Sequence, residues 1–270
     1  MMKFRRLWTG LACAGALVAT AVQAQTPAWP DRPVKVAVGS AAGSAPDIIA
    51  RLIGDQLAQL WGKGVIVDNR PGAGGNLGAQ AAARATPDGT TLWFAHATPV
   101  VMNQFLFKSP GFDAERDFTP IVRVGVNPMM IAVNPSVPVK DLKELVAFSK
   151  AKGGKVSFTT SGTRNIPHLV GETLNQLTGA GMVHVPYKGS QQAAQDAAGG
   201  LAEVYIDAVP PMAPWIGTAG AGGRLKPLAV TTVTSMASMP GVKTAGEQGL
   251  PNFTLTAWNA LMVPRGVPME

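Results

Sequence analysis

The fold class is decided by the stretch Val34-Lys35-Val36-Ala37-Val38-Gly39-Ser40-Ala41-Ala42-Gly43-Ser44-Ala45-Pro46-Asp47. A short apolar run with the character of a strand leads into a segment of Gly, Ser and Ala. From Asp47 to residue 61 apolar residues recur at helical spacing, and Gly62 supplies the helix stop. The stretch therefore predicts a strand, a loop of small residues and a helix.

The same alternation continues after this unit. We expect a strand at 64–67, a Gly-rich turn at 70–75, a helix at 77–84 and, after the Pro-Asp-Gly turn at 87–89, a strand at 91–95. Strands that alternate with helices in this order imply a parallel sheet with helices on its faces.

A second block repeats the pattern. Helices are expected at 140–150, 167–177 and 190–198, the last capped by Ser190, and strands at 155–160, 183–185, 203–206 and 228–231. The apolar stretch 121–133, interrupted at Asn127-Pro128, is expected to cross between the blocks. We therefore expect an α/β fold of two lobes with a ligand cleft between them.

Composition supports this expectation and excludes several classes. The 270 residues are 46% hydrophobic and 14% charged, with one Cys, which excludes a disulfide scaffold and a mainly disordered chain. A chain of this length can bury a sizeable core and often divides into two domains.

The N-terminus has the pattern of a Sec signal peptide. Lys3, Arg5 and Arg6 precede an uncharged run at 7–22, and small residues at Val22-Gln23-Ala24 predict cleavage of residues 1–24 before Gln25. A permanent membrane anchor is the alternative, for which the run is short. Cleavage would remove these three cations and so lower the formal charge of +7. No run of four Lys or Arg remains in the rest of the chain, which argues against a nucleic-acid partner.

Two loops are the candidate binding site. In open α/β sheets ligands bind beyond the carboxyl ends of strands, where helix N-termini attract anions. Two such loops facing across a cleft would hold the two ends of a dianion, and their candidate ligand-binding residues are Ser40, Ala42, Gly43, Ser44, Ala45 and Asp47 in the first and Thr160, Ser161, Gly162, Thr163, Arg164 and Asn165 in the second.

Four of the candidates carry a charge or can acquire one. The fork of Arg164 suits a ligand carboxylate, with a solvated surface Arg as the alternative. Asp47 suits the helix dipole. His168 would contact ligand or pack locally, and Asp207 would orient a ligand or a loop amide.

Other chemistries lack a pattern in the sequence. The segment 72–78 is Gly-rich, but Leu77 stands where a dinucleotide fingerprint needs its third Gly. The three His are far apart with no metal-ligand spacing, and Thr160-Ser161-Gly162 is no hydrolase elbow. We therefore expect no cofactor, no metal site and no catalytic residue.

Several further strings resemble the Bug family, the periplasmic solute-binding proteins of tripartite tricarboxylate transporters. The matching stretches lie, in order, at 29–33, 42–51, 69–75, 87–92, 117–121, 185–189, 228–231 and 247–251, with Trp258. The strings Asn-Arg-Pro-Gly-Ala-Gly-Gly at 69–75 and Val-Pro-Tyr-Lys-Gly at 185–189 are individually specific.

The resemblance implies a type II periplasmic binding fold and a ligand carboxylate held between the two loops by backbone amides, hydroxyls and bridging waters. It implies lobe 1 at 29–128 plus 250–270 and lobe 2 at 129–249. The family continues beyond residue 270 into helices of lobe 1, so we expect that lobe to be incomplete, poorly stable and closed by a return strand within 253–263.

Two departures fall in the site. The first loop of the family usually has Pro-Ala-Gly-Gly where this chain has Ala41-Ala42-Gly43-Ser44, and the second has Gly and Ser where this chain has Arg164 and Asn165. These changes bear on which acid is bound.

The expected function is that of a monomeric, exported periplasmic protein. It would capture a small carboxylated metabolite, such as a dicarboxylate, a tricarboxylate or an amino-acid-like acid, and deliver it to the membrane permease subunits of a tripartite tricarboxylate transporter. A receptor that reports ligand occupancy to a sensor system, and an exported enzyme that uses the same cleft, are the alternatives.

Overall fold

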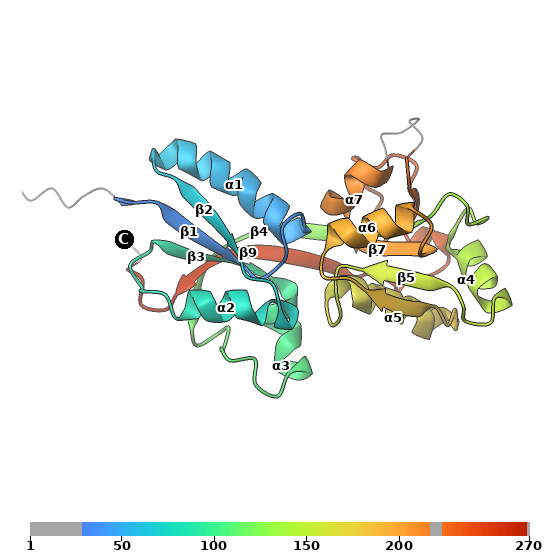
Figure 1. Ribbon diagram of the computed structural model, residues 1–270, viewed down its shortest axis with the longest axis horizontal. Helices are drawn as coiled ribbons and strands as arrows, with labels where there is room; N and C mark the ends of the chain where they lie inside the picture. The colour runs from blue at the N-terminus through green and yellow to red at the C-terminus, as the bar shows by residue number, and fades with distance from the viewer. Residues whose placement is uncertain (1–28, 217–222, 269–270) are drawn as a thin grey trace, which may run out of the picture.

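The computed structural model describes residues 29–216 and 223–268. The predicted signal peptide at 1–24 lies outside these residues. The chain forms two α/β lobes side by side, joined by two long strands that run through both (Figure 1).

The strands form one continuous path in the order β2-β1-β3-β9-β4-β7-β5-β6, with β8 paired to β4. Their bounds are β1 (Val34–Val38), β2 (Val65–Asn69), β3 (Thr91–His96), β4 (Phe118–Val133), β5 (Ser157–Thr160), β6 (Val183–Pro186), β7 (Val204–Ala208), β8 (Lys226–Val230) and β9 (Thr256–Pro264).

The helices that cover this sheet are α1 (Ala45–Trp61), α2 (Asn76–Ala83), α3 (Asn103–Leu106), α4 (Leu142–Ala151), α5 (Ile166–Thr178), α6 (Ser190–Ala198) and α7 (Val209–Ile216). Short helical turns lie at η1 (Ala73–Gly75), η2 (Thr98–Met102) and η3 (Gly246–Gln248). The alternation of strands and helices predicted from the sequence is confirmed in both blocks.

β4 carries the crossing between the lobes. The strand runs unbroken from Phe118 to Val133, where the sequence predicted an interruption at Asn127-Pro128. It changes partners at that point: β9 pairs with it through Pro128, and β7 and β8 pair with it from Met129 or Met130 on. The Asn127 side chain donates to that of Asn259 on β9, so a polar pair is satisfied inside the crossing.

Alternating side chains build the core on both faces of each lobe. On β3, Trp93 packs on the α2 side and Phe94 on the α1 side. On β4, Ile131 belongs to the core below α4 and α5, while Met130 faces α6 and α7. Each large apolar side chain buried in this way contributes about 1.5 to 3 kcal/mol.

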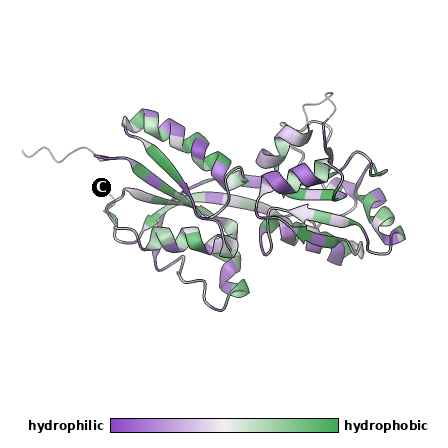
Figure 2. Cartoon of the chain, viewed as in Figure 1, coloured by the Kyte–Doolittle hydropathy of each residue, from purple (hydrophilic) through white to green (hydrophobic). Residues whose placement is uncertain are grey.

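Figure 2 shows the same division by hydropathy, with long hydrophobic stretches on the strands and alternating hydrophobic and hydrophilic residues along α1.

One helix start differs from the prediction. Ser190, expected as the cap of α6, is its first helical residue, and Gly189 is the N-cap. A Cβ on Gly189 would lie 3.3 Å from that of Ala41 in lobe 1, so the chain here passes close to the opposite lobe.

The predicted return strand is β9, which lies between β3 and β4.

Candidate functional site

A cavity of about 490 Å³ lies between the lobes. Its walls come from the loops after β1, β3, β5 and β6, from the Gly-rich turn after β2, and from the crossing strands. Its lining residues are Gly39, Ser40, Ala41, Ser44, Ala45, Pro46, Pro71, Gly72, Gly74, Gly75, His96, Ala97, Thr98, Met129, Ser161, Gly162, Thr163, Asn165, Ile166, Pro167, Tyr187, Lys188, Gly189, Asp207, Ala208 and Ala257.

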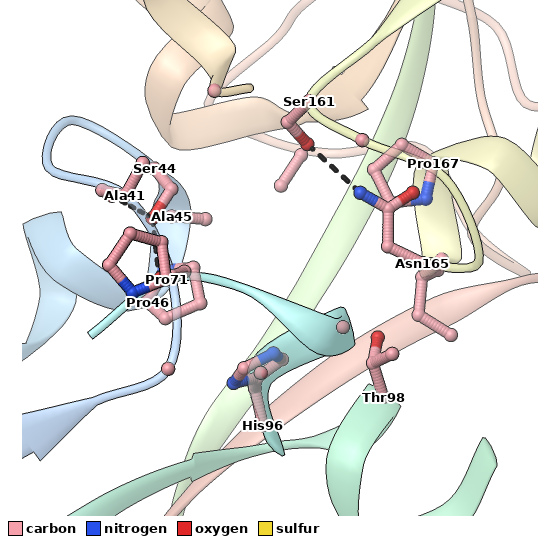
Figure 3. A pocket seen from close by; sticks show the side chains of 18 of the residues that line it. Ala41, Ser44, Ala45, Pro46, Pro71, His96, Thr98, Ser161, Asn165 and Pro167 are labelled. Atoms are coloured by element: carbon pink, nitrogen blue, oxygen red, sulfur yellow. Dashed lines mark hydrogen bonds between the residues drawn. The ribbon is translucent and has the colours of Figure 1, made fainter. Parts of the chain in front are cut away.

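The first wall is the loop between β1 and α1. The Ser44 hydroxyl lies 2.7 Å from both Ser40 Oγ and the carbonyl oxygen of Ala41, so the two serines share one polar edge of the loop. Ser44 is the N-cap of α1, and Pro46 stands in the first turn, where its missing N–H costs no hydrogen bond. This edge faces the cavity (Figure 3).

Asp47 fixes this loop from behind. Its carboxylate accepts hydrogen bonds from Gly43 N at 2.8 Å, Arg51 Nε at 3.0 Å and Asn69 Nδ2 at 2.9 Å. Burial alone would raise the pKa of Asp47, but the hydrogen bonds from Arg51, Gly43 and Asn69 lower it below its ordinary value. Asn69 also donates to the Ser40 carbonyl at 3.1 Å, which connects the end of β2 to the same loop.

The second wall is the loop between β5 and α5. Thr160 Oγ1 donates to the Gly162 carbonyl at 2.7 Å, which folds the loop back at its start. Asn165 is the N-cap of α5: its Oδ1 accepts from His168 N at 3.0 Å, and its Nδ2 lies 3.4 Å from Ser161 Oγ. In Figure 3 Ser161 and Asn165 face the Ser44 edge from the opposite side of the cavity.

Arg164 lies outside the cavity lining. Its guanidinium stands 5.5 Å from the centre of the Phe107 ring in lobe 1, a cation-π contact across the mouth of the cleft. Its backbone has φ of 58°, in the left-handed region.

His168 also lies behind the lining. Its ring stacks on His184 with 4.0 Å between the ring centres.

Asp207 reaches the cavity from β7 and is buried. Its carboxylate accepts from the Ala208 N–H at 2.7 Å and from the Tyr205 hydroxyl at 2.9 Å. Burial raises the pKa of Asp207, and the hydrogen bonds from Ala208 and Tyr205 offset only part of this. The cavity thus has a carboxyl at one end.

The structure brings eight of the predicted site residues together on the lining: Ser40, Ser44, Ala45, Ser161, Gly162, Thr163, Asn165 and Asp207. The remaining six, Ala42, Gly43, Asp47, Thr160, Arg164 and His168, are not part of it. Among these six, Asp47, Thr160 and His168 hydrogen-bond to the backbone or side chains of the two loops.

Besides the segment 96–98 at the end of β3, sequence reasoning missed two Gly-containing parts of the cavity. The first is the Gly-rich turn after β2, interpreted there only as a turn, of which Gly72, Gly74 and Gly75 form part of the wall. The second is Tyr187-Lys188-Gly189, which entered only through the family resemblance. The signal for both was present in the sequence, because each Gly-containing string directly follows a strand.

His96 and Thr98 form the floor between the two loops (Figure 3). Burial lowers the pKa of His96 to about 4, so its imidazole is neutral at pH 7. Among the described residues, Lys188 is the only Lys or Arg that lines the cavity.

The lining is suited to a small polar ligand rather than to a metal. Residues 29–216 and 223–268 hold no group of three or more His, Cys, Asp and Glu placed to bind an ion. Serine and threonine hydroxyls, an asparagine amide and the start of α1 and of α5 converge on the cavity. Such groups hold carboxylates through hydrogen bonds and helix dipoles.

The described helices include none that is long and apolar enough to cross a membrane.

Comparisons with known proteins agree with the fold described above. The family model described as the tripartite tricarboxylate transporter family receptor matches residues 49–270. A UPF0065 protein of Bordetella bronchiseptica is 38% identical over 94% of this chain and 73% of its own length.

Solved structures are similar as well. Rpa4515 of R. palustris with adipate has a TM-score of 0.84 and 30% identity, covering 89% of this chain and 79% of that one. The periplasmic binding protein BugD has a TM-score of 0.82 and 31% identity over the same shares. MatC of Rhodopseudomonas palustris with bound malate has a TM-score of 0.77 and 29% identity, covering 89% of this chain and 80% of that one.

Proposed function

The chain belongs to the tripartite tricarboxylate transporter receptor family, whose members are periplasmic solute-binding proteins, and we propose that it captures a small carboxylated metabolite in the cavity between its lobes. The observation that carries the proposal is the pairing of two hydroxyl-rich loops, after β1 and after β5, on opposite walls of one cavity. Adipate and malate in two similar structures support a carboxylate as the ligand class.

The cavity volume and lining fit this ligand class. About 490 Å³ is within the range of small-molecule pockets. One carboxylate of the ligand would lie between Ser44 and Ser161, where the loops approach the starts of α1 and α5. Lys188 at the rim would attract the negative charge, and Asp207 at the other end would accept a hydrogen bond from a donor on the ligand.

The wider role follows from the family. We propose that residues 1–24 direct export and are cleaved, and that the loaded protein, as a monomer, presents its ligand to membrane permease subunits. We further propose lobe 1 at 29–128 plus 250–270 and lobe 2 at 129–249. The change of partners in β4 at Pro128 supports this division.

A thermal-shift screen tests the ligand class. Malate, adipate, citrate and aspartate are compared with sugars and polyamines at the same ionic strength. A ligand that binds only the native state at one hundred times its Kd raises stability by about 2.7 kcal/mol. Stabilisation by one or more of the acids is expected, and stabilisation by sugars or polyamines alone would overturn the proposal.

Transport needs a separate experiment. A strain that lacks the gene is compared with its parent for uptake of the acid identified in the screen. Loss of uptake supports delivery to a permease, whereas unchanged uptake with a changed transcriptional response would support the receptor alternative.

A further inference from the structure

Three aromatic rings form a stack behind the second loop. The Phe158 ring lies 4.9 Å from that of His184, and the His184 ring lies 4.0 Å from that of His168, with the planes of each pair within 28° of parallel. We call these three residues the histidine stack. Phe158 is on β5, His184 on the neighbouring β6 and His168 on α5, so the stack joins the elements on both sides of the loop.

His184 holds the start of the loop. Its Nε2 lies 2.8 Å from Thr160 Oγ1, whose own hydroxyl donates to the Gly162 carbonyl at 2.7 Å. The Thr160 oxygen therefore accepts from His184, and the proton of a neutral His184 is on Nε2. The turn at Gly162, which lines the cavity, thus depends on this contact.

His168 holds the end of the loop. Its Nδ1 accepts a hydrogen bond from Arg164 N at 3.2 Å. Arg164 has φ of 58°, in the left-handed region that is unfavourable for a residue with a side chain. The acceptor on His168 offsets this strain and so keeps Thr163 and Asn165, on either side of Arg164, on the cavity wall.

The same contact fixes the charge of His168. An Nδ1 that accepts a hydrogen bond carries no proton, and Nε2–H then faces Glu172, whose Oε1 is 3.6 Å away. The His168 imidazole is therefore neutral in this arrangement, because a proton on Nδ1 would set two donors against each other.

We propose that His168 and His184 are positioning residues for the ligand-binding loop at 161–165, His168 through an unprotonated Nδ1 that accepts from Arg164 N and His184 through its contact with Thr160. The proposal rests on the proposed function, because the loop is a wall of the proposed ligand cavity. It adds a role for two residues that lie behind that wall.

The surroundings of the stack favour the neutral state. Burial and the neighbouring His168 lower the pKa of His184 from 6.5 to about 4. The charged groups nearest to His168 are the Glu172 carboxylate, which is 48% exposed and so attracts a cation only weakly, and Arg164, which has its guanidinium on Phe107.

A pair of substitutions at His168 tests the positioning role at pH 7.5. His168→Asn keeps an uncharged acceptor where Nδ1 lies, whereas His168→Leu has a similar size and no acceptor. With malate and adipate as calorimetric probes, His168→Leu is expected to weaken binding about fivefold through the lost hydrogen bond, and His168→Asn to bind within about twofold of the parent protein. Equal affinity of the two variants would overturn the proposal.

A matched pair of substitutions at His184 tests the other contact at the same pH. His184→Gln keeps a side-chain amide that can donate to Thr160, whereas His184→Leu has no donor. His184→Leu is expected to weaken binding about fivefold and His184→Gln to bind within about twofold of the parent protein. Equal affinity of these two variants would contradict the role of His184.

A measurement without ligand separates this proposal from the proposed function. The backbone amide signals of Gly162 and Arg164, recorded by NMR at pH 7.5, are expected to shift in His168→Leu and to stay near their parent positions in His168→Asn. If no acid binds in the screen, the proposed function fails, and this comparison still decides whether the stack orders the loop. Unshifted signals in His168→Leu would overturn the inference.

Discussion

Lys188 and Arg164 are two cations near one cavity, and they occupy different positions relative to it. Lys188 lines the cavity, whereas Arg164 stacks on Phe107 outside it. We therefore expect Lys188→Ala to weaken carboxylate binding by about 1.5 kcal/mol or more, the scale of a hydrogen bond to a charged group. Calorimetry at constant ionic strength measures the change.

Arg164→Ala removes the same formal charge and is the matched control. We expect it to change the dissociation constant less than Lys188→Ala does. The sequence left two roles open for Arg164: pairing with the ligand, in which case Arg164→Ala would weaken binding by about 1.5 to 3 kcal/mol through a lost charge-assisted hydrogen bond, or a solvated surface position. A larger loss for Arg164→Ala than for Lys188→Ala would favour the first of these roles and place Arg164 on the ligand.

Asp207 gives a prediction about pH and stability. Burial raises the pKa of its carboxyl in the folded protein above 3.8, so its contribution to stability is greatest below pH 3.8 and falls as the pH rises through the folded value. Asp207→Asn cannot ionise, and Tyr205 can turn its hydroxyl to the Ser190 carbonyl, 3.2 Å away. The variant is expected to melt at a higher temperature than the parent protein at pH 8.

The stability gain of Asp207→Asn should shrink as the pH approaches 3.8. Asp55→Asn, an exposed position on α1, controls for the change in net charge. Melting curves of the unliganded proteins between pH 4 and pH 8 give the comparison, and a constant difference across this range would contradict the burial argument.

For single positions, the sequence indicated which residues belong to the region of the site, but not what each side chain does there. Asp47 was selected together with the ligand loop, and the structure shows it accepting bonds from Gly43, Arg51 and Asn69 behind that loop. Arg51 lies within α1, and Asn69 is the last residue of β2. No periodicity in the sequence indicates that they meet at one carboxylate.

Elements were more predictable than residues, because hydrophobic periodicity and Gly stops are local signals. The helix expected at 47–61 is α1 (Ala45–Trp61), and the one expected at 167–177 is α5 (Ile166–Thr178). The unbroken course of β4 could not be predicted in this way. It depends on partners from β7, β8 and β9, all of which are far away in sequence.

The close packing of α2 against the loop after β1 can be tested by a substitution at the contact. A Cβ on Gly78 of α2 would lie 2.5 Å from Gly39 Cα, at the start of the loop that forms the first wall. Alanine in a helix is ordinarily about 1 kcal/mol more favourable than glycine. Here we expect Gly78→Ala to lower the free energy of unfolding by about 1 to 3 kcal/mol, because backbone atoms must move.

Gly125→Ala is the control for Gly78→Ala. Gly125 lies on β4, and a Cβ there meets nothing within 4 Å. Urea unfolding of both variants should therefore separate them clearly. A Gly78→Ala protein as stable as the parent would show that the loop and α2 have room to move apart.

At the scale of the whole molecule, the sequence predicted two α/β lobes with a cleft because ligand loops follow the first strand of each block. It could not predict how closely the lobes approach. In the structure Gln191 at the start of α6 lies 3.4 Å from the Gly43 carbonyl, measured from Nε2, and Arg164 meets Phe107 at another point of the rim. The lobes thus touch on two sides of the cavity.

These contacts predict that Gln191 favours the closed arrangement. If only closed molecules bind ligand tightly, the apparent Kd rises as the closed fraction falls. Gln191→Ala should weaken binding about two- to threefold, as expected for one long, exposed hydrogen bond. Small-angle scattering should show a larger radius of gyration without ligand and the parent value at saturation.

Gln192, the next residue along α6, is exposed as Gln191 is, and Gln192→Ala serves as the control. The scattering and the affinity must change together, since both report the closed fraction. A weaker affinity with an unchanged radius of gyration would mean that Gln191 contacts the ligand side of the rim directly. An unchanged affinity and radius would mean that the lobes close for other reasons and that Gln191 meets Gly43 only as a consequence.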